Sequence, residues 1–212
     1  FNLLFLLVLF VLLAAMLDKE GRALFLVREY RRGSGRYYPP GLAELGIDPA
    51  RCFSVDAPDT LAALKATADI ARSGAAGVVL IELAGNPRLL DLTASRRLAL
   101  AAEQTGTAVL LLRLGARESP SAAYSRWQVA SAESAPLLAD APGGPAFTVT
   151  LLRHRRMAAG QSARLMWNME EQKFDEQNVA SKSGEPARAA AFGPALSLAL
   201  RRTADPRPRR AA

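Results

Sequence analysis

The stretch of sequence that decides the fold is GVVLIELAGNPRLLDLTASRRLALAAEQTGTAVLLLR, residues 77–113. It opens with a run of β-branched and aliphatic residues at 78–83, which is short enough for a buried strand, and Gly-Asn-Pro at 85–87 favours a turn after it. A second apolar run at 109–112 closes the stretch. Two continuous apolar strands joined by a helical crossover predict a parallel sheet that is covered on both faces.

The segment between these two strands predicts a helix. Asp91 or Thr93 can cap its first turn, and Gly106 is placed to end it. Arg96 and Arg97 fall inside this helix. Arginines on a helix are usually part of a solvated face, and the alternative is contact with a partner protein or with DNA phosphates.

Similar signals extend the pattern upstream. Strands are expected at 24–27 and 52–55, and Asp59 and Gly74 are placed to begin and end a helix after the second of them. This alternation of strands and helices predicts a wound sheet with right-handed crossovers.

The downstream pattern changes to strands without helices. Further strands are expected at 127–130, 147–152 and 164–167, the last two as a β-hairpin at the edge of the sheet. Trp127 and Trp167, which fall in these strands, are expected to anchor the core.

The 212 residues suffice for one domain with tails, and the net charge of +7 comes with 23 Arg against 4 Lys. A basic surface attracts polyanions and arginine suits phosphate, although dispersed arginine is more often only a solvated surface. The single Cys52 has no disulfide partner within the chain, which suits a reducing compartment. Because His154 is the one histidine that could activate it, the thiol is expected to be structural.

Residues 1–17, FNLLFLLVLFVLLAAML, are apolar except for Asn2. As a helix at about 1.5 Å per residue they would span about 25 Å, slightly less than a bilayer core of about 30 Å. Three interpretations are open. The segment is a membrane anchor with Lys19, Arg22 and Arg28 on the cytoplasmic side, an extended signal sequence, or a helix packed against the sheet.

Several of these segments resemble the ImuA family, RecA-like accessory factors of a bacterial mutagenic repair system. The segments that carry the resemblance are IELAGNPRLLDLTASRRLALAAEQTG (81–106), PSAAYSRWQV (120–129), PAFTVTLLRHRR (145–156), ARLMWN (163–168) and YYPPGLAELGIDPARCFSV (37–55). The resemblance covers residues 24–168, and LDLTASRRLALAAE is its most specific part.

The resemblance implies an α/β fold of the RecA-like kind, with a mostly parallel sheet flanked by helices. The strand pattern adds a C-terminal β-hairpin, and the polar, Ala- and Arg-rich composition of the C-terminal segment predicts a disordered tail. The resemblance favours the packed helix for residues 1–23, followed by a RecA-like domain at 24–172 and a disordered tail at 173–212 that is rich in Arg, Ala and Pro.

The function that the resemblance implies is SOS-induced, error-prone translesion DNA synthesis after DNA damage, as part of DNA repair in the cytoplasm. In that role the chain is a non-catalytic adaptor that recruits or bridges an ImuB-like relative of the Y-family polymerases and an error-prone replicative-type polymerase. DNA itself is a further candidate partner, whereas a membrane is not expected to be one.

The motif required for nucleotide hydrolysis is missing from this sequence. A RecA-like ATPase needs a glycine-rich loop that ends in Lys and Ser or Thr, and no Gly-Lys pair occurs here. Arg-Gly-Ser-Gly-Arg at 32–36 lacks the spacing and the lysine, so a flexible loop is expected there. No cofactor, metal site or catalytic residue is therefore expected.

Glu82 ends a buried strand, where ATPases of this fold place the acid that orients magnesium. Without a phosphate loop, a single carboxylate is expected to pair with an arginine such as Arg88 or Arg113.

Arg153, Arg155 and Arg156 form the other basic cluster, at the tip of the expected hairpin. Three arginines there are a reasonable phosphate contact, although aromatic residues for base stacking are missing beside them.

Two rival functions stay open. The chain is an ATP-dependent, recombinase-like DNA-binding ATPase whose phosphate loop lies upstream of Phe1, or a membrane-tethered regulator that resembles a cell-division inhibitor.

Overall fold

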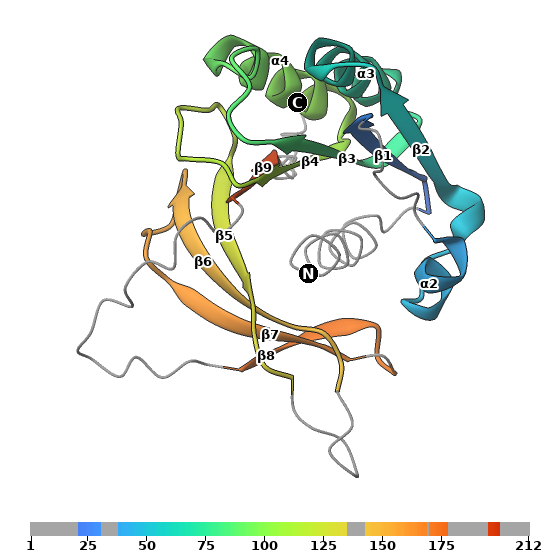
Figure 1. The fold of residues 1–212 in the computed structure, drawn as a ribbon, viewed down its shortest axis with the longest axis vertical. Coiled ribbons are helices and arrows are strands. Elements are labelled where there is room, and N and C mark those ends of the chain that lie inside the picture. The colour runs from blue at the N-terminus through green and yellow to red at the C-terminus, as the bar shows by residue number, and fades with distance from the viewer. Residues whose placement is uncertain (1–20, 31–37, 135–142, 169, 178–194, 200–212) are drawn as a thin grey trace, which may run out of the picture.

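The computed structural model describes residues 21–30, 38–134, 143–168, 170–177 and 195–199. Its strands form one sheet in the order β2-β1-β3-β4-β9-β5-β6-β7-β8 (Figure 1). The helices are α2 (Pro39–Glu44), α3 (Thr60–Ser73) and α4 (Leu92–Thr105), with a 3-10 turn at Pro49–Arg51. The strands are β1 (Ala23–Glu29), β2 (Cys52–Ala57), β3 (Ala76–Ala84), β4 (Ala108–Leu114), β5 (Ser125–Ser131), β6 (Ala146–His154), β7 (Ser162–Asn168), β8 (Lys173–Gln177) and β9 (Ala195–Ala199).

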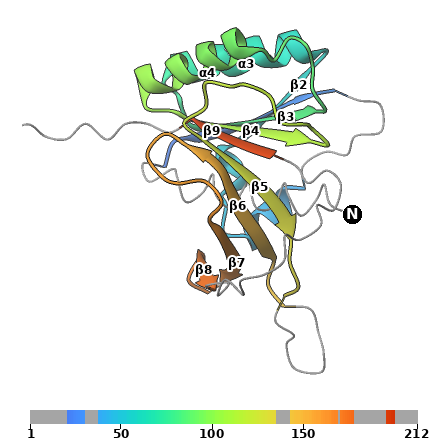
Figure 2. The ribbon, with the colours of Figure 1, turned by 90° about the vertical axis from the view of Figure 1, so that its left-hand side faces the viewer.

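Four strands make the parallel half of the sheet. β1 pairs with β2 on one side and with β3 on the other, and β3 pairs with β4, all in parallel. α3 connects β2 to β3, α4 connects β3 to β4, and both helices cover the same face (Figure 2). The predicted α/β fold, with parallel strands, helical crossovers and a C-terminal hairpin, is confirmed. Among the described strands the sheet is mixed rather than mostly parallel, because parallel pairing is confined to β1–β4 and the other pairs are antiparallel.

Predicted caps set the ends of the two crossover helices. The Asp59 and Asp91 carboxylates each accept a hydrogen bond from the backbone amide three residues later, at 2.7 Å in both helices. Gly74 and Gly106 end the helices, both with φ of 72°, a left-handed conformation that glycine adopts without a Cβ clash. Of the two predicted cap candidates for α4, Asp91 is the cap and Thr93 is not.

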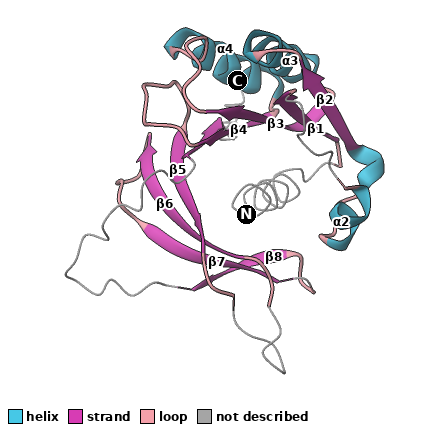
Figure 3. Ribbon diagram, viewed as in Figure 1, coloured by secondary structure: helices cyan, strands magenta, loops and turns pink. Residues whose placement is uncertain are grey.

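The second half of the sheet is antiparallel. β5 pairs with β6, β6 with β7, and β7 with β8 (Figure 3). The predicted hairpin is confirmed as β6 and β7, in which Ala146 lies opposite Met166 and Thr150 lies opposite Ser162. Its predicted place at the sheet edge is wrong, because β8 pairs with β7 and forms the edge instead.

Two strands lie in the range 173–212, for which the sequence predicts a disordered tail. β8 covers Lys173–Gln177, and β9 covers Ala195–Ala199, antiparallel to both β4 and β5 and placed between them. The prediction is wrong for these two segments, because strand pairing satisfies their backbone groups. β8 pairs with β7, the strand directly before it in the sequence, whereas β9 pairs with strands far away in the sequence. Residues 178–194 and 200–212 lie outside the described residues.

Two apolar cores lie on opposite faces of the sheet. One lies between the parallel strands and α3 and α4, and includes Val79 and Ile81. The other lies on the face toward which β5–β8 curve (Figures 1 and 2), and joins Leu80 of the parallel half to Phe147 and Trp167 of the antiparallel half. Burying a side chain such as Phe147 contributes about 1.5–3 kcal/mol. Trp167 is only 3% exposed, so its predicted role as a core anchor is confirmed.

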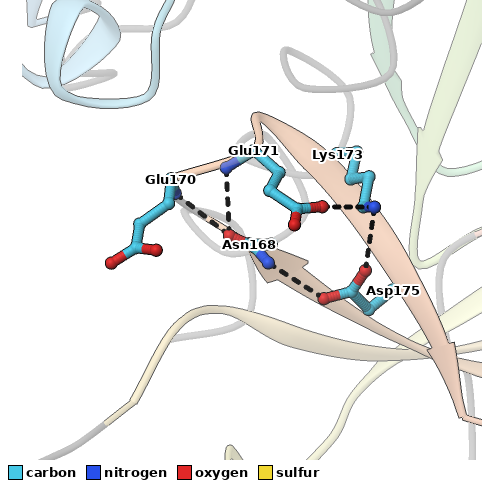
Figure 4. A network of polar contacts seen from close by, with 5 residues as sticks. All are labelled: Asn168, Glu170, Glu171, Lys173 and Asp175. Atoms are coloured by element: carbon cyan, nitrogen blue, oxygen red, sulfur yellow. Dashed lines mark hydrogen bonds and ion pairs between the residues drawn. The ribbon is translucent and has the colours of Figure 1, made fainter.

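The turn between β7 and β8 is held by its own polar side chains (Figure 4). Asn168 Oδ1 accepts hydrogen bonds from the backbone amides of Glu170 and Glu171 at 3.0 and 3.1 Å, and Asn168 Nδ2 donates to Asp175 Oδ2 at 3.2 Å. Lys173 forms ion pairs with Glu171 and Asp175, and the hydrogen bond with Glu171 raises the pKa of Lys173. These side chains therefore stabilise the β7–β8 turn through contacts with one another and with its backbone.

Of the helices in the described part of the chain, none combines the length and the apolar character that a membrane span requires. The apolar segment at 1–17 and the Arg-Gly-Ser-Gly-Arg loop at 32–36 lie outside the described residues, so the predictions for them are untested.

Candidate functional site

Four arginines gather around the loop between β4 and β5, residues 115–124. Arg113 lies on β4, Arg126 on β5 and Arg153 on β6, and Arg155 follows the end of β6. We call these four residues the arginine cluster. Arg126 and Arg153 lie directly opposite each other, and the register shifts by one residue immediately after Arg126. A β-bulge of this kind bends the strands and redirects the side chains next to it.

Arg113 is the most deeply buried member of the cluster, with 4% of its surface exposed. Its Nη1 donates to Ser119 Oγ at 2.8 Å, and its Nη2 donates to Asn86 Oδ1 at 2.5 Å. Burial lowers the pKa of the Arg113 guanidinium, and the charge of Arg126 lowers it further. Asn86 Oδ1 also accepts from the backbone amide of Arg117 at 2.9 Å, so one side-chain amide joins the β3–α4 connection to loop 115–124.

Arg126 holds the middle of the same loop. Its Nη2 donates to the carbonyl oxygen of Ser119 and to Ser121 Oγ, the latter at 3.0 Å. Burial lowers the pKa of the Arg126 guanidinium, the charge of Arg153 lowers it further, and Glu118 partly opposes both. The loop is therefore anchored from its base by a second buried cation.

Arg153 and Arg155, predicted as phosphate contacts, bind the last part of this loop. Arg153 Nη2 donates to the Ala123 carbonyl oxygen at 2.6 Å, and Arg155 Nη2 donates to the Ala122 carbonyl oxygen at 3.0 Å. Arg155 also lies 5.7 Å from the centroid of the Tyr124 ring, which is cation–π distance. Both arginines thus have a structural role in holding the loop.

Arg156 differs from its two neighbours. Its side chain is exposed, and no hydrogen bond or ion pair joins that side chain to another described residue. Of the three arginines predicted at the hairpin tip, Arg156 is the one whose guanidinium the described part of the chain leaves open.

The electrostatic consequence of these contacts is a local excess of positive charge. In the described ranges, Arg113, Arg126 and Arg153 bind neutral oxygen atoms, and none of them forms an ion pair with a carboxylate. The Arg155–Glu103 pair is 3.9 Å long and exposed, so it neutralises little. The site can therefore attract an anion such as a nucleic-acid phosphate, and the anchored loop gives it a fixed shape.

The other predicted pair, Arg96 and Arg97, is split between two surfaces of α4. Arg97 lines a groove against α3. Arg96 lies on another stripe of α4, four residues before Leu100 and seven before Glu103, and Glu103 contacts Arg155. The structure therefore places Arg96 on the side of the arginine cluster and Arg97 on the side of α4 that faces α3.

Glu82 does not lie within the arginine cluster. Its register partners are Arg28 on β1 and Leu112 on β4. Arg113, the next residue after Leu112, points to the opposite face of the sheet, so the predicted pairing of Glu82 with Arg113 does not fit this geometry. Arg88 lines the groove between α3 and α4 instead.

Cys52 and His154 have separate surroundings. Cys52 Sγ donates to the Asp48 carbonyl oxygen at 3.5 Å, whereas His154 Nδ1 accepts from the backbone amide of Met157 at 2.9 Å. His154 also contacts the edge of Tyr124, with 4.8 Å between ring centroids. Within the described ranges, no three His, Cys, Asp or Glu side chains converge as a metal site would require.

Sequence reasoning missed the buried half of the arginine cluster. Arg113 follows directly on an apolar strand, and Arg126 precedes Trp127, so each looks like an ordinary charge at a strand end. The one available signal was the loop between them, whose serines at 119 and 121 supply oxygen atoms to those two arginines.

No family model matches the chain. The chain is 34% identical over 145 residues to Protein ImuA of Caulobacter vibrioides strain NA1000 / CB15N, and the match covers 63% of this chain and 56% of that protein. Protein ImuA of Caulobacter vibrioides strain ATCC 19089 / CIP 103742 / CB 15 gives the same values. The chain thus spans about half the length of the curated relatives that it matches.

Among solved structures, the crystal structure of the RadB recombinase overlaps 79% of this chain and 83% of its own, with a TM-score of 0.41 and 12% identity. At that TM-score the likeness carries no argument about the site. The identity with Protein ImuA, however, spans 63% of the chain, and it confirms the resemblance to the ImuA family that the sequence segments predict.

Proposed function

We propose that the chain is a non-catalytic adaptor in translesion mutagenesis. The observation that carries this proposal is the 34% identity with Protein ImuA over 145 residues. On the analogy with that family, the chain recruits or bridges an ImuB-like relative of the Y-family polymerases and an error-prone replicative-type polymerase. The work takes place at damaged DNA in the cytoplasm, after SOS induction.

The arginine cluster supports a DNA contact within this role. Its buried members fix loop 115–124, and the exposed Arg155 and Arg156 lie at the end of β6 beside that loop. Phosphate contacts of this kind are independent of base sequence and weaken with salt. Such contacts suit a protein that must bind at damaged DNA of any sequence.

The adaptor role is tested by assembling the purified components. The chain, the ImuB-like protein and the error-prone polymerase from one bacterium are mixed and separated by size-exclusion chromatography. Co-elution of the chain with either polymerase supports the proposal, and separate elution of all three in the presence of damaged duplex DNA contradicts it.

Two further measurements separate the adaptor from its rivals. Tight, magnesium-dependent ATP binding by the full gene product would favour the recombinase-like ATPase. A pellet that resists carbonate extraction after cell fractionation would favour the membrane-tethered regulator.

A further inference from the structure

The groove between α3 and α4 belongs to no site described above. The two helices lie side by side on the outer face of the parallel strands (Figure 2). The groove between them has a volume of about 390 Å³. It lies on the side of α4 away from the arginine cluster, so its surface is separate from the proposed DNA contact.

The floor of the groove is apolar, and two of its leucines are unusually exposed. Leu64 and Leu98 are buried, with 7% and 5% of their surfaces exposed, and both belong to the apolar core beneath the two helices. Leu61 and Leu89 line the same groove with 44% and 53% of their surfaces exposed. Apolar surface that is gathered in one groove and rimmed by polar residues is typical of an interaction site.

The charges around the groove are mainly positive and unpaired. Lys65, Arg88 and Arg97 are exposed, and none of the three forms a hydrogen bond or an ion pair with another described residue. The two acids of the rim are already engaged, because Asp69 pairs with Arg72 at 2.8 Å and Asp91 caps α4. Three open cations therefore surround an apolar floor.

We propose that this groove binds an acidic amphipathic helix of a partner protein. The leucines of the groove would bury the apolar stripe of such a helix, and carboxylates beside that stripe would meet Lys65, Arg88 and Arg97. This is the helix-in-groove mode of peptide recognition with complementary charge at the rim. The inference rests on the proposed adaptor function, because an adaptor must have such a partner.

Charge argues against two other possible occupants of the groove, the C-terminal segment of this chain and a second copy of the chain. The C-terminal sequence RRTADPRPRRAA carries five arginines and one acid, so the basic rim would repel it. A second copy of the chain, with a net charge of +7, is repelled in the same way.

Two labelled peptides test the proposal against the full chain. Each has about 16 residues, or roughly four to five helical turns, with leucines on one stripe. One carries Glu beside the leucines and the other carries Lys at the same positions. We expect fluorescence anisotropy to show binding of the Glu peptide at least about tenfold tighter than that of the Lys peptide, and a loss of this difference as salt rises.

Matched variants locate the binding. Arg97→Glu and Leu89→Ser are expected to weaken the Glu peptide about tenfold each. The control variants Arg96→Glu and Leu100→Ser change the same two residue types outside the groove, on a different stripe of α4. They should leave binding of the Glu peptide unchanged. All four positions are exposed, so thermal unfolding should stay close to that of the unsubstituted chain.

Equal binding of both peptides, or equal loss in the Arg96 and Arg97 variants, would overturn the proposal. So would a dimer of the chain that dissociates on Leu89→Ser, because a second copy would then occupy the groove. If neither peptide binds while the chain and its Arg97→Glu variant both co-elute with the polymerases, the groove proposal fails and the adaptor role stands. If the unsubstituted chain elutes alone, the adaptor role itself fails.

Discussion

Arg126 of β5 lies directly opposite Arg153 of β6, so two like charges occupy adjacent positions of one antiparallel pair. Like charges at such positions repel and destabilise a sheet unless other groups compensate. Here the compensation is local, because Arg126 donates to Ser119 and Ser121 while Arg153 donates to the Ala123 carbonyl oxygen. The hydrogen bonds that offset the repulsion between Arg126 and Arg153 are therefore the same ones that hold loop 115–124 in place.

Arg126→Met should loosen loop 115–124 without unfolding the domain. The substitution removes a buried charge, and in global stability this roughly offsets the absence of its hydrogen bonds. The loop loses hydrogen bonds from a charged donor, each of about 1.5–3 kcal/mol, so its amides should exchange about 10- to 100-fold faster. Hydrogen exchange with mass spectrometry measures this directly. The matched control is Arg156→Met, and the same acceleration in both variants would argue against the anchoring role of Arg126.

Asp91→Ala should lower the free energy of unfolding by about 0.5–2 kcal/mol, because α4 loses the side chain that caps its first turn. Thr93→Ala, at the other candidate position, should change it by less than about 0.5 kcal/mol. Urea denaturation monitored by circular dichroism compares the two variants. A larger effect at Thr93 than at Asp91 is the result that this capping geometry forbids.

The parallel half of the fold was predictable because its signals are local. The strands at β3 and β4 are continuous apolar runs, and Asp91 and Gly106 mark the ends of the helix between them. Each of these features depends on residues within one element, so it can be predicted without knowing how the rest of the chain folds.

β9 was not predictable for the opposite reason. The sequence of β9 is ALSLA, and alanine and leucine favour helix when taken alone. Its strand conformation comes from pairing with Leu110 and Leu112 on β4 and with Arg126 on β5. Contacts across such distances in the sequence leave no local pattern.

The candidate site shows the same division. The Arg-His-Arg-Arg run at 153–156 was visible as a cluster because its residues are adjacent. The buried arginines at 113 and 126 are thirteen positions apart, and only the folded loop between them brings their side chains to the same serine. Charge in the sequence therefore locates this surface but does not distinguish anchoring arginines from open ones.

Arg156→Glu should weaken binding to duplex DNA and flatten its salt dependence, because the Arg156 guanidinium is open to a phosphate. We expect the slope of log K against log salt to fall by about one unit for each phosphate that the variant no longer neutralises. Fluorescence anisotropy with one labelled duplex at several salt concentrations provides the measurement. Arg72→Glu, on α3 and also exposed, is the control. An identical salt slope for Arg156→Glu and the unsubstituted chain would exclude this residue as a DNA contact.

Cys52 should react more slowly in the folded chain than in the unfolded one. Burial raises the pKa of its thiol, the charge of Arg51 opposes this, and Asp48 adds to the increase. Because the thiolate is the reactive form, we expect alkylation by iodoacetamide at pH 8.5 to be slower in buffer than in urea. The rate in buffer should also continue to rise at pH values where the rate in urea has levelled off.

The same shift has a definite sign for stability. A group whose pKa is raised on folding keeps its proton longer in the folded state, so its contribution is complete below the unfolded pKa of about 8.5. That contribution is lost as pH rises through the folded pKa. Cys52→Ala should therefore remove part of the fall in unfolding free energy above that pH, measured by urea denaturation at pH 7 and at high pH. Equal alkylation rates in buffer and in urea, together with an unchanged pH profile in Cys52→Ala, would show that the thiol is not held in a buried, protonated form.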